Sequence, residues 1–213
     1  MDYLLYGLTV FALITLLYRM SLWIARKRKP SDVLLTVTVV GFLIFVGVEF
    51  LQETALIGSS EIHFLTADWS YTIAIVALLI GLGLAIRESK PVINQSPQVL
   101  SYLPVLLLVV HPLVQDTLVI RELLLDLYTI AAFLIAFGLL SLEYFRRNTY
   151  GVLLSGVLVL FAGFIIRRYE IIPILHHEIG QLIVISGILI QSKHYNNQLL
   201  KSQKEHYDTQ NRG

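Results

Sequence analysis

The chain has 213 residues, of which 56% are hydrophobic and 15% are charged, and its formal net charge is +1. Soluble domains scatter their apolar residues, whereas here they form long blocks and the mean hydropathy is +0.72. The absence of cysteine excludes disulfides, thiolate metal sites and a catalytic thiol. The near-neutral charge gives no general attraction to nucleic acid, so none is expected as a partner. The composition predicts an all-α integral membrane protein with the lipid bilayer as its surroundings.

Seven apolar segments are candidates for membrane-spanning helices, which need roughly 17–25 residues. In chain order they cover residues 3–24, 33–51, 71–86, 99–114, 118–145, 152–166 and 172–190. Leucine-rich runs without alternation at period two favour helices over strands. The sequence therefore predicts a bundle of seven transmembrane helices over residues 1–192, followed by a polar tail over residues 193–213.

Three of these segments have features of their own. The first is read as a retained helix rather than a signal peptide, because its leader Met1-Asp2 lacks basic residues. The fourth is short and contains Pro104 and Pro112. The fifth is longer than one crossing needs, so its first two turns are expected above the hydrocarbon. The tail after the seventh contains good helix formers and is compatible with an extension of that helix.

The distribution of Lys and Arg predicts the orientation, because cytoplasmic loops are enriched in them. If the loops alternate between two sides, one side holds 13 of the 16 basic residues. The other side holds only Arg121, Arg167 and Arg168. This asymmetry places the N-terminus outside and the C-terminus in the cytoplasm of a multi-pass protein in the plasma (inner) membrane.

Ionisable residues near the predicted outer ends of the helices form the candidate site. The candidate ligand-binding residues are Glu49, His111, Arg121, Asp126, Arg167, Arg168, His176, His177 and Glu178. At helix ends such side chains often only meet headgroups and water. Here His111 directly follows the apolar run PVLLLVV, and three arginines oppose the positive-inside bias. We therefore expect a polar cavity that opens to the outer face.

Spacing within the helices sharpens this expectation. Glu122 and Asp126 are four residues apart, so these like charges share a helix face and need a nearby cation. Arg121, Arg167 and Arg168 are the candidates to supply it. The paired glycines Gly156 and Gly163, and Gly180 and Gly187, are instead expected at close helix contacts, because small residues let helices approach in lipid.

Two kinds of cofactor are compatible with the histidines. His111, His176 and His177 are candidate ligands for a divalent metal, although no HExxH spacing occurs. His111 with His176 or His177 lies at matching depth for a haem b, if the fourth and seventh helices face each other. A retinal Schiff base is excluded, because the seventh helix carries no lysine in its middle.

The leading functional prediction is a ligand-sensing or interaction module, in which a small molecule bound in the outer pocket signals through the cytoplasmic tail. The alternative is a haem b- or metal-binding redox subunit or a membrane enzyme. A partner protein or a homo-oligomer is compatible with either.

Overall fold

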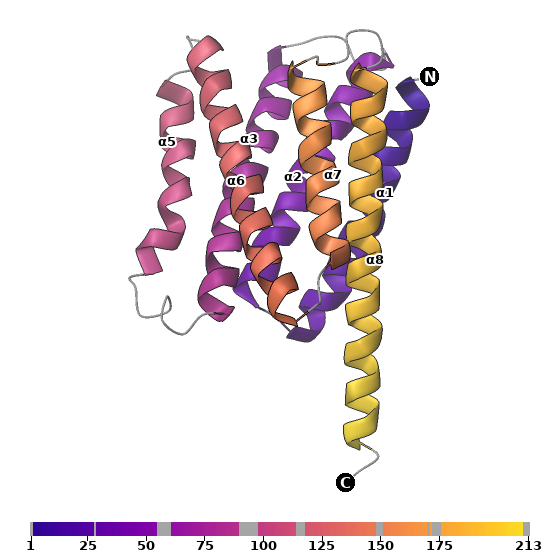
Figure 1. Ribbon diagram of the computed structural model, residues 1–213. Helices are drawn as coiled ribbons and strands as arrows, with labels where there is room; N and C mark the ends of the chain where they lie inside the picture. The colour runs from indigo at the N-terminus through magenta and orange to yellow at the C-terminus, as the bar shows by residue number, and fades with distance from the viewer. Residues whose placement is uncertain are drawn as a thin grey trace.

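The computed structural model describes residues 2–27, 29–54, 61–89, 98–113, 118–147, 151–169, 171 and 176–210 (Figure 1). These residues form the helices α1 (Asp2–Lys27), α2 (Pro30–Glu53), α3 (Glu61–Ser89), the 3₁₀ helix η1 (Gln98–Val105), α5 (Leu106–Leu113), α6 (Leu118–Arg147), α7 (Gly151–Tyr169) and α8 (His176–Gln210). As far as the described residues reach, the predicted apolar segments fall on these helices, the fourth on η1 and α5. Residue 114 of the fourth segment and residues 172–175 of the seventh lie outside the described part. The all-helical prediction is therefore confirmed.

The length and composition of the helices indicate a membrane protein. Within the described residues, four apolar stretches are long enough to cross a bilayer: Leu4–Ala25, Pro30–Gln52, Leu65–Arg87 and Glu122–Leu142. Large apolar side chains such as Phe11 (67% exposed) and Phe145 (84% exposed) point away from the rest of the protein. A soluble protein rarely exposes so many such groups, whereas lipid covers them at no cost.

Prolines mark the start of α2 and lie within the fourth segment, where the helix type changes. Pro30 lies at the start of α2, where a missing backbone N–H removes no helical hydrogen bond. Pro104 lies inside the fourth segment, which runs as a 3₁₀ helix up to Val105 before α5 begins. Pro112 then lies in the last turn of α5. The fourth segment is therefore a 3₁₀ helix that continues directly into a short α-helix, rather than one regular α-helix.

Six long helices pack in a closed cycle. Going around it, α1 contacts α2, α2 contacts α3, α3 contacts α6, α6 contacts α7, α7 contacts α8, and α8 returns to α1. The pair η1 and α5 packs on α3 at one side of the molecule (Figure 1). The C-terminal half of α8 continues beyond the other helices and ends far from the N-terminus (Figure 1). The predicted helical extension into the tail is thus observed.

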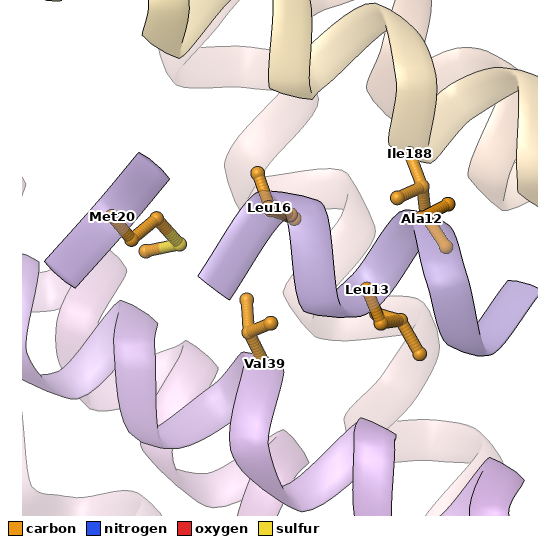
Figure 2. Close-up of a cluster of buried hydrophobic side chains, with 6 residues drawn as sticks. All are labelled: Ala12, Leu13, Leu16, Met20, Val39 and Ile188. Atoms are coloured by element: carbon orange, nitrogen blue, oxygen red, sulfur yellow. The ribbon is translucent and has the colours of Figure 1, made fainter. Parts of the chain in front are cut away.

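The largest buried cluster among the described residues joins α1, α2 and α8. Its members are Ala12, Leu13, Leu16, Met20, Val39 and Ile188 (Figure 2). In Figure 2 the stretch of α1 that carries Ala12, Leu13 and Leu16 lies between Val39 of α2 and Ile188 of α8. In lipid such a cluster stabilises the fold by close packing rather than by removal of apolar surface from water.

Glycines allow α7 and α8 to approach closely. A Cβ added at Gly187 would lie 2.6 Å from Leu160 Cγ and 2.9 Å from the Gly156 carbonyl oxygen. A Cβ at Gly163 would lie 3.0 Å from the Gly180 carbonyl oxygen. Real Cβ atoms essentially never come closer than 3.0 Å and seldom come as close as 3.0 Å, so the two pairs of glycines are packing residues, as the sequence predicts.

Candidate functional site

The site lies at one end of the bundle, where four helices of alternating direction bring their polar ends together. The last turns of α2 and α7 meet the first turns of α3 and α6, because successive helices run in opposite directions. This is the end that holds the N-terminus, opposite the end from which α8 extends (Figure 1).

A pocket of about 400 Å³ opens between these helix ends. The described residues that line it are Phe45, Glu49, Asp68, Tyr71, Glu122, Leu125, Asp126, Phe164 and Arg168. The volume lies within the range of roughly 300–1,000 Å³ typical of small-molecule sites. Four carboxylates, one guanidinium and three aromatic rings therefore share one opening.

Arg168 bridges two acids near the start of α6, Glu122 and Asp126. Its Nε donates to Asp126 Oδ2 at 2.9 Å, and its Nη2 donates to Glu122 Oε2 at 2.8 Å. Glu122 and Asp126 lie on one face of α6, four residues apart, and Arg168 lies in the last turn of the neighbouring α7. Burial lowers the pKa of the Arg168 guanidinium, but the hydrogen bonds and the negative charges of the two carboxylates together raise it above its usual value. The guanidinium is a permanent counter-charge for this pair.

Asp68 and His111 form a second polar contact. His111 Nε2 lies 2.7 Å from Asp68 Oδ2, and the side chains are 3% and 11% exposed. The indole of Trp69 meets the imidazole edge-on, with 5.0 Å between ring centroids. His111 is therefore held between two residues of α3, behind the carboxylate that faces the pocket. It orients Asp68 and is not among the lining residues.

Tyr71 forms a fixed aromatic wall. Its hydroxyl lies 2.9 Å from Thr129 Oγ1, and Thr129 in turn donates to the Leu125 carbonyl at 2.7 Å. The arrangement in which Tyr71 donates to Thr129 satisfies both hydroxyl groups. The ring of Tyr71 also packs against Phe45, with 5.1 Å between centroids and 55° between planes. The contact with Phe45 and the hydrogen bond at the hydroxyl restrict the movement of the ring.

Three of the predicted site residues, Glu49, Asp126 and Arg168, line the pocket, while His111 lies behind it. The other five are carried by α6, α7 and α8, and their side chains lie outside the described part of the chain. These five are Arg121, Arg167, His176, His177 and Glu178.

Asp68 and Glu122 line the pocket but were not among the candidates. Asp68 was missed because the third helix was expected to start at residue 71, whereas α3 begins at Glu61. The earlier start moves Asp68 from a loop to two turns inside a helix. For Glu122 the sequence did offer an indication, namely its spacing from Asp126. For the aromatic lining residues it offered none, because a phenylalanine in an apolar helix is ordinarily lipid-facing.

The described residues supply no donor set for the metal or haem with which the histidines of the sequence are compatible. Among them no group of three or more His, Asp or Glu side chains has the geometry to hold a metal ion. The ring nitrogen Nε2 of His111 is already engaged by Asp68, and a haem ligand there would have to displace this contact. A second histidine would have to come from His176 or His177, whose side chains lie outside the described part.

Comparison with known proteins finds no matching family model, no matching curated protein and no matching solved structure. The function must therefore be inferred from the pocket and its place in the fold.

Proposed function

We propose that the chain is a multi-pass protein of the plasma membrane that binds a small molecule in this pocket and reports its presence through α8. The observation that carries the proposal is the pocket itself, in which charged and aromatic side chains from four helices converge on a space of ligand size. Ionisable groups placed within a membrane domain usually serve a ligand or an ion rather than the fold.

The charge asymmetry supports an outward-facing pocket. The described charged residues of the pocket all lie at the helix ends that the sequence assigns to the membrane side poor in Lys and Arg. With the basic side in the cytoplasm, the pocket opens to the exterior and α8 extends into the cell. The seven helical segments then account for seven crossings, with η1 and α5 together forming the fourth.

The packing offers a route from the pocket to α8. Arg168 and Phe164 belong to α7, which is in close glycine contact with α8, so a shift of α7 displaces α8 as well. Near the cytoplasmic end, Tyr195 of α8 packs on the cluster shared by α1 and α2. Burial and the charge of Asp32 raise the pKa of Tyr195, so its hydroxyl stays neutral there. A ligand that prefers one arrangement of these helices shifts its population.

The binding step is tested by a thermal-shift screen of the purified protein in nanodiscs, with panels of amines, carboxylates and sugars. Leu125→Trp fills the pocket from within, and Leu142→Trp is the matched control, exposed on the same helix. A ligand at 100 times its Kd adds about 2.7 kcal/mol to stability. We expect at least one compound to raise the melting temperature of the wild type and of Leu142→Trp but not of Leu125→Trp. If every active compound stabilises all three proteins alike, the pocket is not the binding site.

The signalling step is tested with spin labels attached to introduced cysteines. Because the chain has no cysteine of its own, the labels react only at the chosen positions. Lys29→Cys and Lys201→Cys place labels at two exposed positions, the first at the start of α2 and the second on the extended part of α8. The ligand from the screen should change the distance distribution between them. An unchanged distribution at saturation means that the pocket binds without moving α8.

A further inference from the structure

From the charge and the aromatic lining of the pocket we infer that its ligand is a small organic cation, an ammonium group attached to an apolar body. The inference depends on the proposed function, since it specifies the ligand of the same site. It is carried by three independent features of the described lining residues: their balance of charge, the placement of their aromatic rings and the contacts of their arginine, Arg168.

The described residues that line the pocket carry more negative than positive charge. Glu49, Asp68, Glu122 and Asp126 contribute four carboxylates, and Arg168 contributes one positive charge. The balance is three negative charges with His111 neutral, and two with His111 protonated. In a recess with low-dielectric walls such an imbalance attracts cations and repels anions more strongly than on an open surface.

Arg168 does not serve as an anion receptor. Two of its donor atoms, Nε and Nη2, already point at Asp126 and Glu122. A carboxylate or phosphate ligand would have to displace one of these groups while lying close to the remaining acids. The guanidinium therefore organises the acidic wall instead of offering a site to an anion.

Aromatic rings surround the same space. Phe45, Tyr71 and Phe164 come from three different helices, and the planes of Phe45 and Tyr71 meet at 55°. Rings set at an angle around a recess offer their negative faces to a cation, which is the usual way in which proteins hold substituted ammonium groups. The hydrogen bond of Tyr71 to Thr129 keeps the ring of this lining residue in place.

An organic cation fits this pocket better than a metal ion. A divalent metal requires several oxygen or nitrogen ligands within about 2.0–2.6 Å, and no such group occurs among the described residues. A space of about 400 Å³ is also far larger than one ion needs. Carboxylates spread over three helices, with rings between them, suit a ligand that has both a charged and an apolar end.

The test compares benzylammonium with two analogues of the same shape, benzyl alcohol and benzoate, by titration calorimetry on the full chain in nanodiscs. We expect benzylammonium to bind, and benzyl alcohol and benzoate to bind at least tenfold more weakly. Phe164→Leu keeps an apolar wall and should weaken benzylammonium about 3- to 30-fold. Glu49→Gln should weaken it about tenfold or more. Glu205→Gln, on the exposed tail, is the matched control and should bind as the wild type does.

Each other outcome counts against the inference. Equal or tighter binding of benzoate or benzyl alcohol overturns the cationic class, yet leaves a ligand pocket in place. Benzylammonium binding that survives both substitutions, or that persists in Leu125→Trp, places the cation elsewhere, for example in the lipid. If none of the three compounds binds, the inference is wrong, while the proposed function is still decided by the wider screen.

Discussion

Removing the guanidinium of Arg168 should destabilise the protein by leaving two acids of one helix face without their shared cation. In Arg168→Ala the carboxylates of Glu122 and Asp126 lose hydrogen bonds of 2.8 and 2.9 Å. These like charges, four residues apart on α6, then repel each other.

The magnitude follows from how exposed each partner is. A charge stranded in a fully buried place costs about 3–5 kcal/mol, and a solvent-exposed pair is worth about 0.2–1 kcal/mol. The side chains of Arg168 and Glu122 are 36% and 51% exposed, so this contact belongs to the second class. The side chain of Asp126 is only 17% exposed, which places its contact between the two. Together they give an expected loss of about 2 kcal/mol.

The assay is thermal unfolding in detergent, followed by tryptophan fluorescence. For a chain of this length about 2 kcal/mol corresponds to a fall in Tm of roughly 4–8 °C. Lys201→Ala, an exposed residue of the α8 extension, is the matched control and should stay within about 0.5 kcal/mol of the wild type. Arg168→Lys keeps the charge but cannot direct two donors at once, so it should fall between the two.

A double substitution isolates the cause. If the stranded Asp126 carboxylate is responsible, adding Asp126→Asn to Arg168→Ala should restore part of the lost stability, with a coupling of about 0.5–3 kcal/mol. A Tm for Arg168→Ala equal to that of Lys201→Ala, or a coupling energy of zero, would refute the reasoning. Arg168 would then only contact lipid headgroups and water.

Three further predictions concern packing, pH and topology. Gly187→Ala should be about 1–3 kcal/mol less stable than Gly138→Ala in the same unfolding assay, because only at Gly187 does the added methyl group meet a filled contact. Both substitutions gain the same helix propensity, so this gain cancels in the comparison. Equal stability would mean that α7 and α8 can separate freely. Burial lowers the pKa of His194, so the folded state favours the neutral ring; stability should fall as pH drops below about 6.5, and less so in His194→Gln. Reporter fusions after Lys29 should report the cytoplasm and those after Ser60 the exterior, and the reverse pattern would overturn the orientation.

The helices were predictable because lipid offers no hydrogen-bond partners, so each apolar run must satisfy its backbone hydrogen bonds within itself. The close contacts of Gly156 and Gly187 were predictable for a related reason, since small residues have few other uses there. The start of α3 was not. Residues 61–70 mix polar and apolar types, and the chain continues the helix through them.

Asp68 and its contact with His111 were hidden by that boundary. The two residues lie 43 positions apart, and nothing in the sequence states that η1 and α5 pack on α3. The role of Arg168 was easier to anticipate, because a like-charge pair at helical spacing demands a cation and only three were available on that side. The aromatic walls depend on the cyclic order of the helices, which hydrophobicity alone does not encode.

The proposal that the pocket is acidic and opens to the outside is tested most directly by cysteine accessibility. Leu125→Cys places the only thiol of the chain on the pocket wall. Intact cells are treated with membrane-impermeant methanethiosulfonates carrying either a trimethylammonium or a sulfonate group, with each rate divided by that reagent's rate on free mercaptoethanol. We predict modification from outside, with a normalised rate at least tenfold higher for the cationic reagent. No reaction in intact cells but reaction in inverted vesicles, or equal normalised rates for the two reagents, would contradict an outer pocket with negative walls.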